Sequence, residues 1–245
     1  MNKILVTGGS KGIGLECVKR FVSEGWHVIC CSRDSATWNE QVSNFSQLKD
    51  VEYYVCDVSN KEDVATMFNS IENKHSRIDA AVNNASPAVK SLGKFKDVDL
   101  ELLRETLDDD LWSTILCLKH EIDITNEGGS IVNITSINGL RPTPGASMYG
   151  AAKQAIESLT KSIALEAVED KIRVNSVAPG VTWTPRWEER NSENPGIRED
   201  VEDAVPIKRF ATANEIANCV SWLISDEASY VVGHTLVVDG GLSLK

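Results

Sequence analysis

The chain has 245 residues, a formal net charge of −11 and the apolar content of an ordinary globular protein. Its length allows one large α/β domain or two small domains. The acidic charge argues against a nucleic-acid partner, whose phosphates require a basic patch, and against anionic membrane surfaces. The first apolar run stops at Thr7-Gly8, too early for a secretory signal, so we expect a cytoplasmic protein with no membrane partner.

Short β-rich runs alternate with longer helical patterns along the whole chain. This alternation predicts a doubly wound α/β fold, in which a parallel sheet carries helices on both faces. Several runs are continuously apolar, as expected for strands that are covered on both sides. The expected strands are Lys3–Val6, His27–Cys31, Val51–Cys56, Ile78–Val82, Ser130–Ile134, Arg173–Ala178 and Thr235–Val238. The expected helices are Gly12–Ser23, Lys61–Glu72, Leu100–Ile122, Tyr149–Glu169 and Asn214–Ile224.

No internal repeat or low-complexity linker divides the chain, so residues 1–245 are expected to form a single domain. The segment Trp183–Val205 breaks the pattern, because it is polar, charged and interrupted by Pro185 and Pro195. Long irregular segments of this kind are usually functional or disordered. Since the segment follows a strand and precedes the last helix, we expect a substrate lid at 183–205.

Cysteine and histidine give no metal-binding or disulfide pattern. The six cysteines contain no C-x-x-C pair and lie mostly within apolar runs, so we expect buried free thiols. The four histidines, His27, His75, His120 and His234, show no spacing typical of metal ligands. No metal site is therefore predicted.

The first expected strand leads into a glycine-rich turn that opens the first helix. The turn reads Thr7-Gly8-Gly9-Ser10-Lys11-Gly12-Ile13-Gly14. Glycines let the backbone approach a pyrophosphate, and the N-terminus of the helix offers free N–H groups to it. A plain strand–helix turn is the alternative, but the position after an N-terminal strand favours a dinucleotide site.

The whole sequence, apart from the expected lid, resembles the short-chain dehydrogenase/reductase family. Thr7 to Gly14 match its T-G-x-x-x-G-I-G motif. The resemblance implies a single Rossmann domain with a seven-stranded parallel sheet, a nicotinamide cofactor and oxidoreductase activity. Further segments similar to family motifs are Cys56-Asp57-Val58, Asn83-Asn84-Ala85, Ile131 to Ser136, Val174 to Gly180 and Val238 to Gly241. The resemblance implies cofactor contacts at Gly8, Ser10, Lys11, Gly12, Ile13, Gly14, Asp57, Val58, Asn84, Ala85, Pro179, Gly180, Thr182 and Thr184, and at Tyr149 and Lys153.

The end of the second strand favours NADP over NAD. NAD-binding proteins commonly place an acidic residue there, which binds the ribose 2′-hydroxyl. Here the strand ends in Ser32-Arg33, and a guanidinium can bind a 2′-phosphate through two hydrogen bonds. Lys11 could add a second cation. The alternatives are that both are solvated surface cations, or that Asp34 binds a ribose hydroxyl.

Tyr149 and Lys153 are four positions apart and share one face of the expected helix. Reduction of a carbonyl needs a proton donor at its oxygen, and a nearby ammonium makes a tyrosine hydroxyl a better acid–base group. Ser136 precedes Tyr149 by thirteen residues, which is the family spacing, and ends an expected strand, where active-site residues of open α/β sheets gather. The resemblance implies a Ser136–Tyr149–Lys153 catalytic core in which Lys153 also holds the nicotinamide ribose.

Two positions depart from the family pattern. The family segment N-N-A-G reads Asn83-Asn84-Ala85-Ser86 here. The alignment also places Asp110 where many members have an asparagine that holds a water in a proton relay with the lysine. Asp108 and Asp109 precede it, so a shifted alignment or a solvated acidic helix face is the alternative.

These observations predict an NADP(H)-dependent enzyme acting on a small-molecule ketone or secondary alcohol. Two alternatives stay open: a 3-oxoacyl-[acyl-carrier-protein] reductase, disfavoured because acidic carrier proteins need basic docking residues, and a non-catalytic dinucleotide sensor. The resemblance also implies a homo-oligomer, a tetramer or a dimer, that pairs through Leu100–Ile122, Tyr149–Glu169 and the C-terminal segment.

Overall fold

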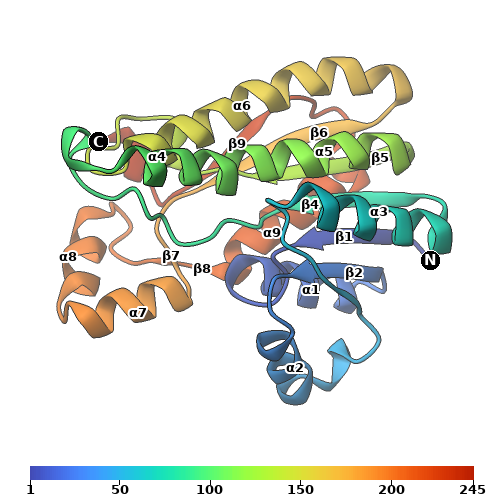
Figure 1. The fold of residues 1–245 in the computed structure, drawn as a ribbon, viewed down its shortest axis with the longest axis horizontal. Coiled ribbons are helices and arrows are strands. Elements are labelled where there is room, and N and C mark those ends of the chain that lie inside the picture. The colour runs from blue at the N-terminus through green and yellow to red at the C-terminus, as the bar shows by residue number, and fades with distance from the viewer.

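The computed structural model describes residues 1–245 and contains one seven-stranded, fully parallel sheet (Figure 1). The strand order is β3-β2-β1-β4-β5-β6-β9, so the chain winds outward from β1 in both directions. The predicted doubly wound Rossmann domain is thereby confirmed. The strands are β1 (Lys3–Thr7), β2 (His27–Ser32), β3 (Glu52–Val55), β4 (Ile78–Asn83), β5 (Thr125–Ile134), β6 (Arg173–Pro179) and β9 (Thr235–Val238).

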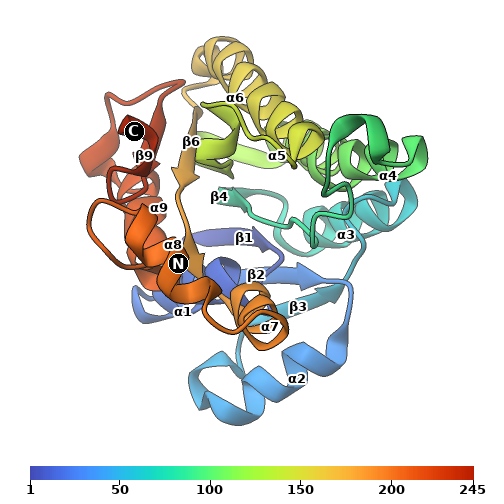
Figure 2. The ribbon, with the colours of Figure 1, turned by 90° about the vertical axis from the view of Figure 1, so that its left-hand side faces the viewer.

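Helices cover both faces of this sheet (Figures 1 and 2). Side chains of β1 alternate between the faces: Ile4 and Val6 belong to one core and Leu5 to the other. The cores hold 21 and 19 buried residues, so neither face is left open to solvent. One face carries α1 (Gly12–Ser23), α2 (Ser35–Asn44) and α9 (Ala213–Ile224), and the other carries α3 (Lys61–His75), α5 (Ser113–Ile124) and α6 (Ser147–Ala167).

The predicted helix Leu100–Ile122 is present, but a π-helical turn interrupts its α-helical pattern. It consists of α4 (Leu100–Leu107), a π-helical turn at Asp108–Trp112 and then α5. A π turn inserts one extra residue into the helix and is frequent at functional sites. Asp110 lies inside the turn, and its side chain is 2% exposed.

The segment Trp183–Val205, expected to be irregular, is mostly helical. It contains the short strand β7 (Thr182–Trp183), which pairs with β8 (Ala211–Thr212), and the helices α7 (Pro185–Glu193) and α8 (Ile197–Ala204). Pro185 occupies the first turn of α7, where its missing N–H costs nothing. In Figure 2 these two helices lie nearest the viewer, over one end of the sheet.

A row of polar side chains runs along the buried face of α6. Lys153, Glu157 and Thr160 follow Tyr149 at helical spacing, and all three are at most 3% exposed. Glu157 accepts hydrogen bonds from the hydroxyls of Ser176 and Thr235. Thr160 accepts one from the Asn133 side chain on β5 at 2.9 Å. The buried face of α6 is thus joined to the sheet by hydrogen bonds as well as by apolar packing.

The six cysteines are free thiols, as expected, and all but Cys219 are buried. Burial raises the pKa of the Cys17 thiol to about 12, which keeps it protonated and unreactive. No helix of the structure combines the length and the apolar character needed to cross a bilayer.

Candidate active site

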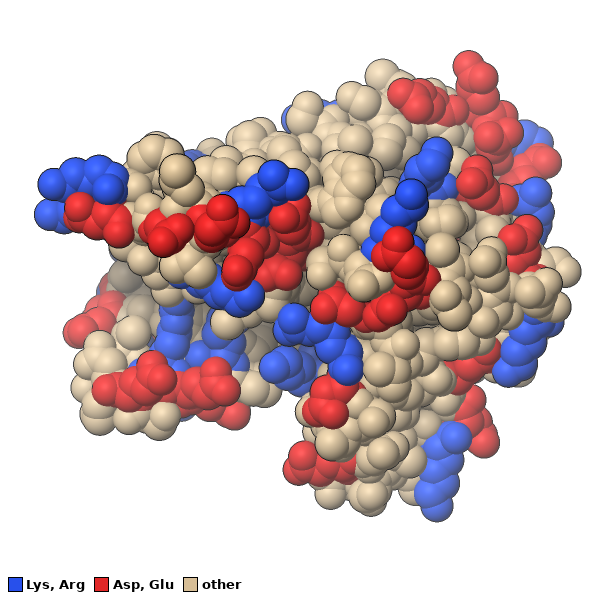
Figure 3. Space-filling view, viewed as in Figure 1, with Lys and Arg blue, Asp and Glu red and all other residues tan.

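A cavity of about 730 Å³ opens at the carboxyl ends of the strands, where open α/β sheets bind their ligands. Every site residue expected from the sequence lines this cavity except Gly14 and Asp110, which lie just behind its wall. Six lysine or arginine and four aspartate or glutamate residues line it. The cavity therefore carries an excess of positive charge in a chain of net charge −11. Figure 3 shows cations around the hollow between the α7–α8 unit and the rest of the molecule.

The glycine turn packs directly against the end of β4. The Asn84 side chain donates hydrogen bonds to the carbonyls of Thr7 and Gly8, at 3.1 and 3.2 Å. A Cβ atom on Gly14 would lie 2.2 Å from the Gly8 carbonyl oxygen and 2.4 Å from the Asn84 amide, so no other residue fits there. This contact fixes the path of the turn across the floor of the cavity.

The N-terminus of α1 faces the cavity without a side-chain cap. Lys11 is the N-cap residue, and no side chain accepts a hydrogen bond from the first turn. The N–H groups of that turn and the positive end of the helix dipole are free for an anion. Together with the close-packed glycine turn, this arrangement fits the pyrophosphate of a dinucleotide.

The side chains of Arg33 and Asp34 differ in their hydrogen-bond partners. The Asp34 carboxylate caps α2, accepting from the N–H groups of Ala36 and Thr37 at 2.9 and 3.2 Å. These hydrogen bonds, that of Ala36 first, lower the pKa of Asp34. Arg33 is exposed and lines the cavity beside Lys11. Helix capping therefore engages the acidic residue at the end of β2, while the adjacent guanidinium stays free to bind an anion.

The chain after β5 packs tightly against the first turns of α6. This packing brings Ser136 to the same part of the cavity as Tyr149 and Lys153. A Cβ atom on Gly139 would lie 2.8 Å from backbone atoms of Lys153 and Gln154. The Lys153 Nζ lies 5.4 Å from the centre of the Tyr149 ring. The Ser136 hydroxyl accepts from the Asn138 N–H at 3.1 Å, which leaves its own proton for a ligand.

Lys153 forms a buried ion pair with Asp110. Its Nζ lies 3.0 Å from Asp110 Oδ1, and the two side chains are 4% and 2% exposed. Burial by itself lowers the pKa of Lys153, but the charges of Asp110 and Tyr149 and the hydrogen bond with Asp110 together outweigh it, so the pKa is raised. The carboxylate thus contacts the lysine directly, while Asp108 pairs with Arg104 at the surface.

Arg186, which the sequence analysis did not single out, joins α7 to the loop after β4. Its guanidinium donates to the carbonyls of Ser86 and Pro87, at 2.9 and 2.6 Å. Trp183 and Trp187 both pack edge-on against Phe210, with ring centroids 5.1 and 5.0 Å apart. These contacts place the α7–α8 unit over the cavity. An isolated arginine in a polar segment carries no sequence signal of such a contact.

Comparison with known proteins identifies the family. A family model described as enoyl-(acyl carrier protein) reductase matches residues 8–243. An uncharacterized oxidoreductase of Escherichia coli, YohF, is 34% identical over 98% of this chain and 95% of its own. This chain belongs to the short-chain dehydrogenase/reductase family. A tropinone reductase homolog of Arabidopsis thaliana is 36% identical over 98% of this chain and 90% of its own.

Solved structures of this short-chain dehydrogenase/reductase family superpose closely on the chain. The structure of ElxO with NADP bound has a TM-score of 0.92 at 28% identity, and covers 100% of this chain and 99% of its own. A second ElxO structure, of a variant with a tyrosine replaced by phenylalanine, holds NADPH. Membership of the family implies that this chain is an oxidoreductase with a nicotinamide cofactor and a small-molecule substrate.

Proposed function

We propose that this chain is an NADP(H)-dependent reductase or dehydrogenase acting on a small-molecule ketone or secondary alcohol. The observation that carries the proposal is one shared cavity: Ser136, Tyr149 and Lys153 line the same space as the glycine turn and Arg33. A bound nicotinamide supplies or accepts the hydride. The protein has to position the substrate oxygen and transfer one proton to it during reduction, or from it during oxidation.

The three side chains divide this work. The Ser136 hydroxyl donates to the substrate oxygen and positions it. Tyr149 gives its phenolic proton to that oxygen during reduction and takes it back during oxidation. Lys153 stabilises the phenolate through its charge and binds the nicotinamide ribose. Asp110 holds Lys153 in place and keeps it charged.

The cations near the first two strands support NADP as the cofactor. Arg33 and Lys11 would bind the 2′-phosphate of the cofactor. The free N–H groups at the N-terminus of α1 would bind its pyrophosphate. The remaining cofactor contacts are proposed at Asp57, Val58, Asn84, Ala85, Pro179, Gly180, Thr182 and Thr184. The ElxO structures with NADP and NADPH support this choice by analogy.

A carrier-protein reductase is the second candidate, because the matched family description names that class. The surface beside the cavity opposes it: residues 185–204 hold seven acidic residues and three arginines. An acidic carrier protein would be repelled there. The α7–α8 unit, residues 183–205, serves instead as a lid that closes over a small free substrate.

A turnover assay tests the proposal. Free ketones and secondary alcohols, and an acyl-carrier-protein thioester, are offered with NADPH or NADP⁺, and absorbance of the nicotinamide is followed. Turnover of free carbonyl compounds supports the proposal, and turnover of the thioester alone favours the second candidate. Tight NADPH binding without any turnover would identify a dinucleotide sensor.

We also propose a homo-oligomer, a dimer or a tetramer, that pairs through Leu100–Ile122 (α4 and α5), through Tyr149–Glu169 (α6) and through the C-terminal segment. Leu165 on α6 is 72% exposed and Tyr230 is fully exposed, and contact with a second copy would remove such apolar surface from water. Light scattering coupled to size-exclusion chromatography measures the mass directly. The cytoplasmic location stays a prediction from the sequence.

A further inference from the structure

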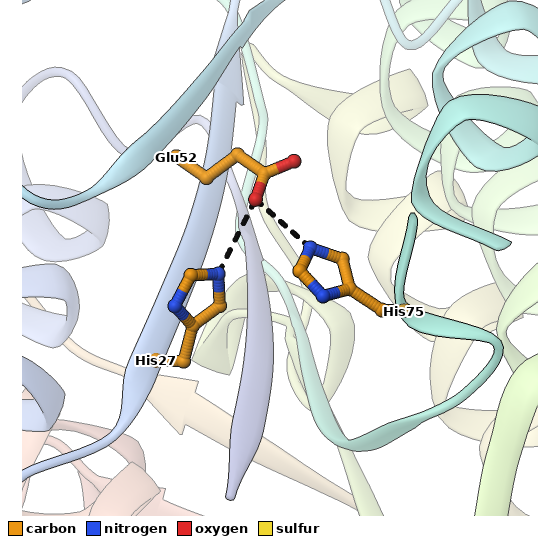
Figure 4. A group of neighbouring side chains, drawn as sticks. All are labelled: His27, Glu52 and His75. Carbon is orange, nitrogen blue, oxygen red and sulfur yellow. Dashed lines mark hydrogen bonds and ion pairs between the residues drawn. The ribbon is translucent and has the colours of Figure 1, made fainter. Parts of the chain in front are cut away.

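Two histidines and a glutamate meet at the end of the sheet opposite the cavity (Figure 4). His27 and Glu52 are the first residues of β2 and β3, and His75 is the last residue of α3. Glu52 Oε2 lies 3.2 Å from His27 Nε2 and 2.8 Å from His75 Nε2. In Figure 4 both imidazole rings point their Nε2 atoms at this one oxygen.

The three side chains have the donor atoms and spacing of a zinc site. Imidazole nitrogen and carboxylate oxygen bind Zn²⁺ at about 2.0–2.2 Å, and two histidines with one glutamate form a known three-ligand set. In a tetrahedron with such bonds, neighbouring ligand atoms are about 3.3 Å apart. All three ligand atoms lie within 4.8 Å of one another, so small side-chain shifts suffice to reach that geometry.

The cluster is sheltered yet reachable from solvent. The side chains of His75 and Glu52 are 9% and 11% exposed, and that of His27 is 27% exposed. Tyr54 donates a hydrogen bond of 2.5 Å to the second oxygen of Glu52 and fixes the carboxylate. Outer hydrogen bonds of this kind orient metal ligands. The partly open side at His27 leaves a fourth position for water.

Lys74 competes for the same carboxylate oxygen. Its Nζ lies 2.8 Å from Glu52 Oε2, and its side chain is 59% exposed. Without a metal, the cluster is an ion-pair network, and that is the alternative explanation of its geometry. A surface lysine gains little from such a pair and can turn into solvent, whereas a divalent ion binds all three ligands at once.

We propose that His27, Glu52 and His75 bind one divalent transition-metal ion, with Zn²⁺ the best match to the donor set. The ion joins β2, β3 and α3, three elements separated in the chain, and so stabilises the folded state. None of the three residues lines the active-site cavity, which lies at the other end of these strands. The site is therefore separate from the proposed reaction.

The test uses full-length, tag-free protein stripped of metal and titrated with Zn²⁺ by calorimetry. We expect one ion per chain and, at about 100 times Kd, a rise in Tm of roughly 5–10 °C. Because the partly exposed Cys219 thiol could also bind zinc, the titration is repeated in Cys219→Ser. Unchanged binding in that variant is expected, and loss of binding there would overturn the proposal.

Variants of the cluster separate a metal site from an ion-pair network. His75→Gln should weaken Zn²⁺ binding by more than about tenfold, while His234→Gln, which changes an exposed histidine elsewhere, should leave it unchanged. Lys74→Ala should strengthen binding, because the competing cation is gone. Failure of both the wild type and Lys74→Ala to bind Zn²⁺, weaker binding in Lys74→Ala than in the wild type, or full binding in His75→Gln would each overturn the proposal.

Spectroscopy keeps the test decisive if His75→Gln does not fold. Co²⁺ replaces Zn²⁺ in the wild type and reports its ligands through absorption. The proposed site should give tetrahedral bands without the sulfur-to-cobalt charge-transfer band that thiolate ligands produce. A charge-transfer band would assign the ion to cysteine and overturn the proposal. Carbonyl reduction, if measured with and without Zn²⁺, should not change.

Discussion

The Ser86 hydroxyl donates a 2.6 Å hydrogen bond to Asp110 Oδ1, the same oxygen that lies 3.0 Å from Lys153 Nζ. Both residues depart from the pattern of the family, and the structure joins them. An ionised carboxylate can only accept hydrogen bonds, and here it has a neutral donor and a charged one. Ser86 therefore balances part of the added negative charge beside the proposed catalytic lysine.

Asp110→Asn should move the limb on which the rate of alcohol oxidation rises with pH to lower pH. Oxidation requires Tyr149 without its proton, and the negative charge of Asp110 opposes that state. The check is kcat/KM for oxidation against pH. Asp108→Asn is the control, because Asp108 pairs with Arg104 at the surface. Superimposable profiles of Asp110→Asn and wild type would exclude an influence of Asp110 on the reaction.

Tyr149→Phe should reduce turnover by about 10²–10⁴-fold and leave NADPH binding nearly intact, because only the proton donor is lost. Lys153→Ala should lose turnover and also bind NADPH more weakly, since both roles are proposed for this lysine. Steady-state rates and fluorescence titration of NADPH provide the two readouts. Near-normal rates in Tyr149→Phe would refute the assignment.

Arg33→Ala should raise KM for NADPH by roughly 10- to 100-fold and change KM for NADH little. A charged hydrogen bond to phosphate contributes about 1.5–3 kcal/mol, and NADH has no 2′-phosphate. Both constants are measured with the same carbonyl substrate. Arg104→Ala, at the surface of α4, serves as the control and should affect neither. An equal loss with both cofactors would mean that Arg33 does not distinguish them.

The α7–α8 unit should exchange its amide hydrogens quickly in the free protein and slowly with NADPH and substrate bound. Arg186→Met removes the two hydrogen bonds to Ser86 and Pro87 and should speed exchange in α7 further. Arg186→Lys keeps the charge but loses the planar guanidinium, so its exchange rate in α7 should lie between those of the wild type and Arg186→Met. Hydrogen exchange with mass spectrometry measures this by segment, and a unit that is fully protected without ligand contradicts a lid.

Glu121→Gln should stabilise the protein at pH 8–9 but not at pH 5. Burial raises the pKa of Glu121 from 4.5 to about 8, although a hydrogen bond from Asn83 lowers it. The folded state therefore binds this proton more tightly than the unfolded state. Its stabilising effect is complete below about pH 4.5 and is lost as the pH rises to 8, by up to about 1.4 kcal/mol per pH unit.

Urea unfolding from pH 5 to pH 9 measures that difference. Asp123→Asn, an exposed acid on the same helix, is the matched control and should follow the wild-type curve. Parallel curves for wild type and Glu121→Gln over this range would show that Glu121 does not titrate as its burial requires.

The sequence predicts all seven strands of the large sheet, because continuous apolar runs bounded by turns are a strong local signal. The bounds of α1 also agree, since glycines mark its start. The helices α7 and α8 were missed because they bury no residue completely and carry few apolar side chains. The π turn at Asp108–Trp112 was missed because apolar periodicity does not resolve one inserted residue.

For the candidate site too, local sequence patterns could be interpreted, whereas contacts that only the fold creates could not. Residues on local motifs, such as Tyr149 and Lys153, could be proposed from their spacing. The bond between Ser86 and Asp110 and the cluster of His27, Glu52 and His75 could not. Their members lie more than twenty positions apart, and only the sheet brings them together.

The polar row on α6 constrains how this helix can turn about its own axis. Successive residues are 100° apart on a helix, so a slip of one residue would carry Glu157 and Thr160 away from Ser176, Thr235 and Asn133. That slip would place the Glu157 carboxylate against apolar side chains without hydrogen-bond partners, which costs far more free energy than losing a contact at the surface. The same rotation sets the direction of the Tyr149 hydroxyl two turns away. The orientation of Tyr149, the proposed proton donor, is therefore fixed by hydrogen bonds of residues that do not contact the substrate.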